Sequence, residues 1–216
     1  MKKKCVFLLL LSVLSFPLLG QNIIYSNMKA LVNHDGDTVK VLRVEKRSKS
    51  QIVLSGGADY RLVADDNESL CRYLKKRSFA VRTAEGNLYI NCRKLRYKKM
   101  RFGAWYAPAV LLDKNVYFCA MPLGSVIGEN FIAEDHPKLG GEVGDALAAS
   151  SLVNKRVCYE LNSETGKVEF VSKSKMTELL DKYPDLKEAY LKKDSREAKH
   201  TFQFLQKVCD DKQTKE

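Results

Sequence analysis

Residues 79–92 (FAVRTAEGNLYINC) and 109–121 (AVLLDKNVYFCAM) decide the fold of this chain. Each stretch consists of two strand-like runs joined by a short polar turn, at 84–87 in the first and 113–115 in the second. Short connections join antiparallel neighbours, because parallel strands need a long crossover. Both stretches therefore predict antiparallel β-hairpins.

The same pattern continues on either side of these two hairpins. Asp35-Gly36 and Gly56-Gly57 are typical turn residues between strand-like runs, and Gly166 occupies a turn further along the chain. Further pairs of strands are expected at 28–33 with 38–44, 51–54 with 59–63, and 156–161 with 168–171. The chain is thus expected to form mainly antiparallel hairpins, arranged as a meander.

Helical periodicity is confined to two regions. Leu70 and Leu74 have the spacing of the buried side of one internal helix, with Asp65, Asp66 or Asn67 as its N-cap. From residue 172 onward, apolar residues three and four apart predict C-terminal helices, the first capped by Ser174. Pro184 is expected to begin the next helix, and Asp194 or Ser195 the last.

The connection at 122–152 is too long for a plain loop and holds five of the chain's 12 glycines. Gly140, Gly144 and Ala148 recur every four residues, a spacing that lets a helix pack closely against another backbone. We expect a small-residue-rich helical segment there. The predicted fold class is α+β, as a single domain over 21–216 with a β-rich part (21–121), this connection, and a hairpin plus helices (153–216).

The first 20 residues have the composition of a secretory signal peptide. Lys2, Lys3 and Lys4 precede an apolar run at 6–14, and a turn-prone stretch ends at Gly20. The apolar part spans about fourteen residues where a membrane-crossing helix needs about twenty. Cys5 lies before this run, so it is not a lipidation cysteine. We expect an exported protein, in the periplasm, at the cell surface or secreted, with no transmembrane segment after signal removal.

Positive charge is concentrated in one half of the chain. The net charge is +11, and residues 40–101 carry 17 Lys and Arg against 6 Asp and Glu. Within this half, six basic residues interleave with aromatic and aliphatic ones: Arg93, Lys94, Arg96, Lys98, Lys99 and Arg101. The pattern is more typical of a half-buried strand with a solvated basic face, and a polyanion-binding element is the alternative. Its partner would be anionic lipid, lipopolysaccharide or acidic polysaccharide, since nucleic acid is not expected outside the cell.

The cysteines and histidines do not form a recognisable site. Removal of the signal peptide leaves five cysteines, an odd number, without the spacing of a zinc site or a redox C-x-x-C. Cys92 and Cys119 lie in strand-like runs and are expected to be buried thiols. His34, His136 and His200 fall in a hairpin turn, a polar loop and a surface helix, so no metal site is predicted.

No catalytic or cofactor-binding residue is predicted either. Ser172 and Lys175 match the S-x-x-K pattern of penicillin-recognising enzymes, but the companion motifs are missing and a serine at a helix start is typical of capping. No phosphate-binding loop or dinucleotide fingerprint occurs, so no cofactor is expected. An enzyme would need partners brought together from distant segments.

Six segments together resemble an uncharacterised exported family of the Bacteroides group, a domain of unknown function. They are GGADYR at 56–61, LYINC at 88–92, FGAWYA at 102–107, LGGEVGDA at 139–146, RVCYEL at 156–161 and ETGKV at 164–168. The resemblance implies compartment and lineage and assigns no catalytic residue. Asp37-Thr38-Val39 is similar to the O-glycosylation acceptor pattern of that group's envelope proteins, which implies modification of Thr38.

Three hypotheses for the function follow. The first is a non-catalytic envelope or surface module that binds a partner or has a structural role. The second is association with anionic lipid or polysaccharide through the basic segment at 72–101. The third is a small envelope hydrolase whose active site is assembled from distant residues.

Overall fold

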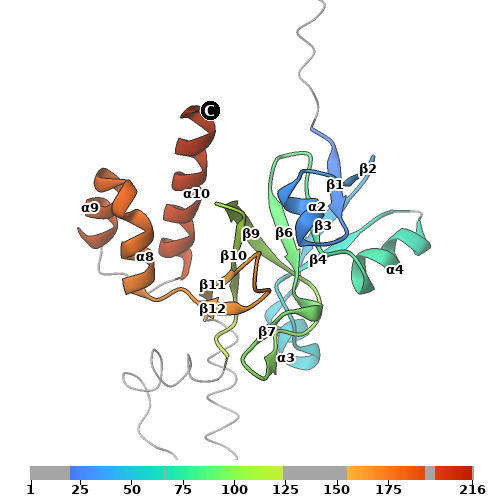
Figure 1. Cartoon of the computed structure of the whole chain (residues 1–216). Helices are drawn as coiled ribbons and strands as arrows, with labels where there is room; N and C mark the ends of the chain where they lie inside the picture. The colour runs from blue at the N-terminus through green and yellow to red at the C-terminus, as the bar shows by residue number, and fades with distance from the viewer. Residues whose placement is uncertain (1–19, 66, 124–154, 193–197, 216) are drawn as a thin grey trace, which may run out of the picture.

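The computed structural model describes residues 20–65, 67–123, 155–192 and 198–215. Within these residues the chain forms one large, mostly antiparallel sheet of twelve strands, accompanied by several helices (Figure 1). The predicted α+β class is confirmed, including the helices at the C-terminal end. None of the described helices combines the length and the apolar character that crossing a membrane would require.

The elements follow one another from the N-terminus as short strands and helices. The strands are β1 (Asn22–Tyr25), β2 (Asp37–Val39), β3 (Arg43–Lys46), β4 (Tyr60–Val63), β5 (Ala80–Arg82), β6 (Leu88–Asn91), β7 (Arg96–Tyr97), β8 (Met100–Arg101), β9 (Tyr106–Leu112), β10 (Asn115–Ala120), β11 (Val157–Leu161) and β12 (Val168–Phe170). The α-helices are α2 (Met28–Val32), α3 (Lys49–Ser55), α4 (Glu68–Lys76), α8 (Lys173–Leu179), α9 (Pro184–Lys192) and α10 (Ala198–Lys215), and short 3-10 turns η1 (Cys92–Lys94) and η2 (Leu180–Lys182) complete them.

The strand order is β2-β1-β5-β6-β9-β10-β11-β12-β7-β8, with β4 paired to β3 and to β9. The hairpins β5–β6, β9–β10 and β11–β12 are antiparallel, as their short turns predict. The pairing of β12 with β7 is parallel, at Val168 and Tyr97. It joins strands distant in sequence, which the local turn pattern could not indicate.

Two predicted strands are helices instead. Residues 28–33 contain α2, because the Asn27 side chain accepts a hydrogen bond from the Ala30 amide at 2.9 Å and caps a helix. Residues 51–54 lie in α3, which begins with a capping box between Ser48 and Gln51. Each short helix lies in the connection between paired strands, β1 with β2 and β3 with β4. The single strand predicted at 38–44 is accordingly two strands, β2 and the start of β3.

The later helices agree more closely with the sequence. Asn67 caps α4, and Leu74 on that helix is fully buried. Ser172, not Ser174, caps α8 by accepting from the Lys175 amide at 3.2 Å. Pro184 begins α9 as expected. The predicted caps Asp194 and Ser195, and almost all of the 122–152 connection, lie outside the described residues.

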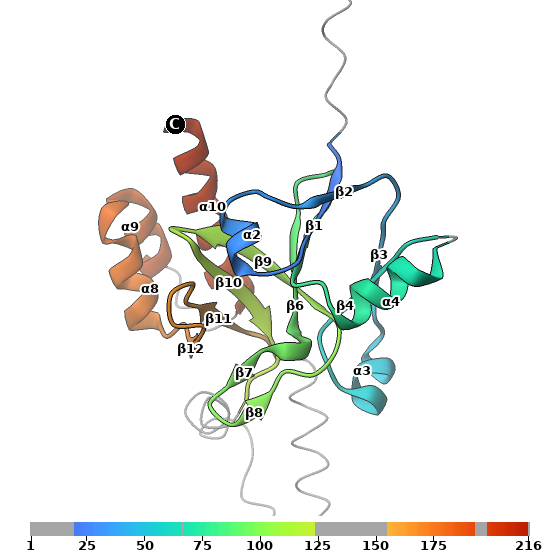
Figure 2. The same cartoon turned by 45° about the vertical axis from the view of Figure 1, so that its right-hand side comes forward.

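Strands β10 and β11 are buried on both faces. Alternate residues of β10, Val116, Phe118 and Ala120, face an aromatic core that also contains Tyr97, Phe102 and Tyr159. The residues between them, Tyr117 and Cys119, face the C-terminal helices. Figures 1 and 2 show α8, α9 and α10 together on one side of the molecule, away from α3 and α4.

Buried polar side chains take part in the packing around the C-terminal helices, among them Glu160 and His200. Glu160 accepts hydrogen bonds from the Tyr117 hydroxyl at 2.9 Å and the Asn115 amide at 2.7 Å, and forms an ion pair with Lys175 of α8. His200 of α10 is buried and stacks on the Tyr190 ring with centroids 5.0 Å apart. The predicted surface position of His200 is therefore wrong, because its ring completes the packing between α9 and α10.

Candidate anion-binding surface

The basic stretch forms a small hairpin of its own, which we call the basic hairpin (residues 92–102). It consists of η1, β7 and β8, with Arg96 opposite Arg101 and Tyr97 opposite Met100. Lys98 at the turn has a left-handed φ of 54°. Figure 2 shows β7 and β8 projecting at the lower end of the sheet.

Buried and exposed side chains alternate along the basic hairpin. Leu95, Tyr97 and Phe102 belong to the aromatic core, where Phe102 packs edge-on against Tyr159 with centroids 4.8 Å apart. Cys92 is buried in the same core, whereas the side chains that point to solvent include all six predicted residues: Arg93, Lys94, Arg96, Lys98, Lys99 and Arg101. The core side chains thus fix the backbone that presents the basic groups.

Most of these positive charges form no ion pair with a described carboxylate. Among the described residues, no carboxylate forms an ion pair with Arg93, Lys94, Arg96, Lys99 or Arg101. Lys98 lies near the Tyr97 ring, with its Nζ 5.3 Å from the ring centroid. Like charges on neighbouring residues of one hairpin repel one another, and a bound polyanion would relieve that repulsion.

A second group of cations surrounds Trp105, which follows the basic hairpin in the chain. The Arg47, Arg61 and Lys75 side chains lie 5.5, 5.7 and 5.3 Å from the centre of its ring. Distances of this size are those of cation–π contacts. The sequence did not reveal this group, because its members lie on β4, α4 and two connecting segments.

Arg47 has a structural role within this group. It is buried, and its guanidinium donates to the carbonyls of Gln51, Gly56 and Ala58 and to the Ser55 hydroxyl, at 2.6 to 2.9 Å. Burial lowers its pKa, and the charge of Asp59 partly offsets that effect. Arg61 and Lys75 are the solvent-facing cations of the group, and Arg61 lies 3.9 Å from Glu45.

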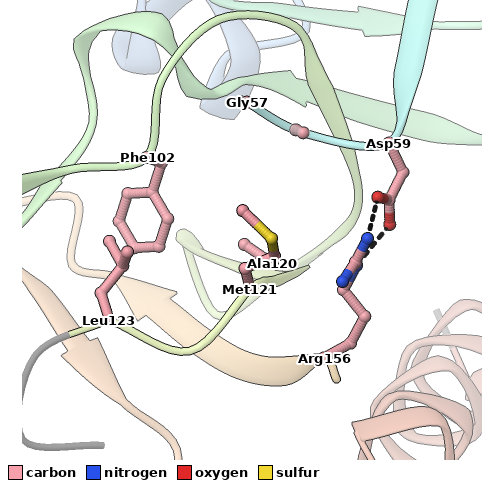
Figure 3. Close-up of a pocket in the computed structure, with 8 residues that line it drawn as sticks. Gly57, Asp59, Phe102, Ala120, Met121, Leu123 and Arg156 are labelled. Carbon is pink, nitrogen blue, oxygen red and sulfur yellow. Dashed lines mark hydrogen bonds and ion pairs between the residues drawn. The ribbon is translucent and has the colours of Figure 1, made fainter. Parts of the chain in front are cut away.

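A small cavity and an open groove are present in the described part of the chain. Figure 3 shows a cavity beside the ion pair of Asp59 and Arg156, with Phe102 and Leu123 on its other side. Its volume of about 10 Å³ accommodates no more than a water molecule. An open groove of about 820 Å³ lies between β6, β9 and α10, lined by polar side chains such as Gln203 and Gln206. Neither contains any of the predicted basic residues.

Cys209 and Ser78 are potential nucleophiles among the described residues, and the surroundings of neither side chain activate it. Burial raises the pKa of Cys209, beside the open groove, to about 11, so its thiol stays protonated at neutral pH. The hydroxyl oxygens of Ser78 and Tyr106 lie 2.5 Å apart. Both residues are buried, and both hydroxyl groups donate to the Leu74 carbonyl near the end of α4. These hydrogen bonds satisfy a backbone carbonyl at the C-terminal end of α4, which is a structural role. Within the described ranges, no three His, Cys, Asp or Glu side chains are grouped so that they could hold a metal ion.

The remaining predicted residues are distributed as follows. Thr38 is exposed on β2, which lies at one edge of the sheet. Cys92 and Cys119 are buried, as predicted. His34 lies in an exposed turn, whereas His136 is outside the described residues.

Comparison with known proteins identifies the family only. No curated protein and no solved structure matches the chain significantly. One family model matches residues 23–212, which is most of the sequence. The chain therefore belongs to a family of unknown function, DUF6563.

Proposed function

We propose that the protein is an exported, non-catalytic binding module of the cell envelope or surface. Its partner is an anionic envelope component, namely anionic lipid, lipopolysaccharide or acidic polysaccharide. The resemblance to an exported family of the Bacteroides group and the signal-like first 20 residues support the compartment. Thr38, exposed on an edge strand, is the proposed O-glycosylation site.

One observation carries the choice of partner. The basic hairpin exposes its six cations while burying Leu95, Tyr97 and Phe102 in the aromatic core. Rigid presentation matters, because a surface that is already ordered loses less conformational entropy on binding. The cations Arg61 and Lys75 near Trp105 add to the positive potential of the same half of the chain.

A hydrolase is the weaker hypothesis. The thiols of Cys92 and Cys158 are buried, and burial raises their pKa above the usual range. Ser78 is enclosed beside Tyr106. Broad activity-based probes are therefore expected to leave the protein unmodified, and stoichiometric labelling of one residue would favour the hydrolase.

The binding proposal is tested with a fourfold variant, R93Q/R96Q/K99Q/R101Q. Its matched control, K29Q/K40Q/K46Q/K49Q, removes the same charge from exposed lysines elsewhere. Sedimentation with phosphatidylglycerol–phosphatidylcholine vesicles and affinity for heparin distinguish a lipid from a polysaccharide partner. The variant should bind at least tenfold more weakly, since each basic residue near an anionic surface contributes about 1 kcal/mol.

The control variant should retain most of the affinity. Equal losses in both variants would show that net charge alone attracts the anion and would contradict a defined surface. Export is tested separately by N-terminal sequencing of protein from the envelope and the medium. A new N-terminus near Gln21 is expected, and an intact Met1 in the cytosol would contradict export.

A further inference from the structure

Cys119 and Cys158 face each other on neighbouring strands. They are directly opposite in the register of β10 and β11, and their Sγ atoms lie 3.1 Å apart. Both are thiols in the structure. They are 39 positions apart in the sequence, so no local spacing indicated that they would meet.

The backbone geometry of β10 and β11 is compatible with a disulfide bond between Cys119 and Cys158. The Cys158 carbonyl accepts a hydrogen bond from the Val171 amide at 2.9 Å, just beyond β12. A residue's N–H and C=O point to the same side of a strand, so those of Cys158 point away from β10. Cys119 and Cys158 therefore form a non-hydrogen-bonded pair, in which Cα atoms are about 4.5 Å apart. That separation falls within the range of about 4.4–6.8 Å found for disulfides.

The pair lies beneath the C-terminal helices. Cys119 is 7% and Cys158 2% exposed, and both belong to the core that contains Met176, Leu205 and Val208. An oxidant cannot reach the sulfurs once these helices are packed. The bond must form while the strands are paired and the helices are still undocked, after which the same packing shields it from reductants.

We infer that Cys119 and Cys158 form a disulfide when the chain folds in an oxidising compartment. The inference rests on the proposed export, because the cytosol keeps thiols reduced. The oxidant is the disulfide of a thiol oxidoreductase or of oxidised glutathione. One thiolate attacks it to give a mixed disulfide, and the second displaces the carrier. One S–S bond forms and one breaks, the two protein thiols lose two protons and two electrons, and the carrier is released reduced.

The other cysteines are expected to remain thiols. Cys71 is held by the backbone of Ala64, and Cys209 donates to the Leu111 carbonyl at 3.5 Å. Cys92 is fully buried in the aromatic core, whereas Cys119 and Cys158 face the C-terminal helices. The oxidised protein should thus contain one specific bond.

The first test is independent of the leader. The full chain is reduced, unfolded and refolded in a buffer of reduced and oxidised glutathione, as in oxidising compartments. It is then alkylated in denaturant and digested for mass spectrometry. A linked peptide containing Cys119 and Cys158 is expected, with Cys71, Cys92 and Cys209 alkylated. Recovery of Cys119 and Cys158 as alkylated residues would overturn the inference, whatever the outcome of the export test.

The second test measures stability. Dithiothreitol present during unfolding should lower the melting temperature of the oxidised chain by about 5–10 °C. The variant C119A/C158A should melt at the same temperature with and without reductant. C209S serves as the control and should respond like the wild type. A wild-type melting temperature that is insensitive to reductant would contradict the bond.

Discussion

At the scale of single residues, Gly57 and Gly103 occupy positions where two backbone segments touch. Gly57 has φ of +84° and Gly103 of +86°, the left-handed region that favours glycine. A Cβ on Gly57 would lie 2.3 Å from the Ala104 carbonyl oxygen. The close approach of the two backbones and the 2.8 Å hydrogen bond from the Ala58 amide to the Ala104 carbonyl oxygen together hold the segment that carries Trp105.

Gly57→Ala should therefore destabilise the protein by more than about 2 kcal/mol, because backbone atoms cannot yield to the new methyl group. Gly86→Ala is the matched control, with a φ of +86° and no atom near its Cβ position. It should cost only about 1 kcal/mol. Urea unfolding measures both, and equal losses would show that φ alone, not the close approach, determines the cost.

The ion pairs of Lys175 are the second residue-scale feature. Lys175 contacts Glu160, which is buried, and Glu169, which is exposed. Burial acts to lower the pKa of Lys175, but its bonds to the two carboxylates outweigh that effect and raise it. The bond from Lys175 also lowers the pKa of Glu169.

Lys175→Gln should reduce the free energy of unfolding by about 1–3 kcal/mol, because it removes bonds to two carboxylates and leaves Glu160 without its counter-charge. Lys192→Gln, in an exposed pair with Glu188, should cost less than about 0.5 kcal/mol.

The lowered pKa of Glu169 stabilises the fold above the carboxylate's ordinary pKa, and this contribution is lost as pH falls through the lowered value. The raised pKa of Lys175 contributes below its ordinary value and is lost as pH rises through the raised one. Unfolding curves across pH should therefore differ most between wild type and variant around neutral pH, and least at strongly acidic and strongly alkaline pH.

At the scale of elements, the sequence predicted the structure correctly where two strand-like runs and the turn between them were all recognisable. The β5–β6, β9–β10 and β11–β12 hairpins each have their turn between two clear strand-like runs, so their pairing required no distant information. Residues 28–33 and 51–54 are short apolar runs that fit a strand or a helix equally well. The local signals that favour a helix are their caps, Asn27 and the Ser48–Gln51 capping box.

The start of α8 offers an element-scale prediction. Ser172 accepts from the Lys175 amide, while Ser174 is exposed within the first turn of the helix. Ser172→Ala should destabilise the protein by about 1 kcal/mol through loss of the cap. Ser174→Ala should leave thermal unfolding almost unchanged. The opposite ranking would place the helix start two residues later than the structure has it.

At the scale of the whole molecule, the contacts that the sequence could not indicate join distant segments. Examples are the parallel pair of β7 with β12, the cations around Trp105, and Cys119 opposite Cys158. Each depends on the sheet order, which the hairpin turns do not determine. The basic residues between positions 93 and 101 could be found because they lie close together in the sequence. Only the structure shows that they form an exposed row beside the buried Leu95, Tyr97 and Phe102.

The central claim is that this exposed row contacts an anionic partner, and the salt dependence of heparin affinity tests it most directly. Each contacting cation releases counterions, so the logarithm of affinity should fall linearly with the logarithm of salt concentration. For R93Q/R96Q/K99Q/R101Q the slope should be shallower by about one for each lost contact, while K29Q/K40Q/K46Q/K49Q should keep the wild-type slope. Wild-type affinity that is unaffected by salt, or an unchanged slope in the first variant, would contradict the account.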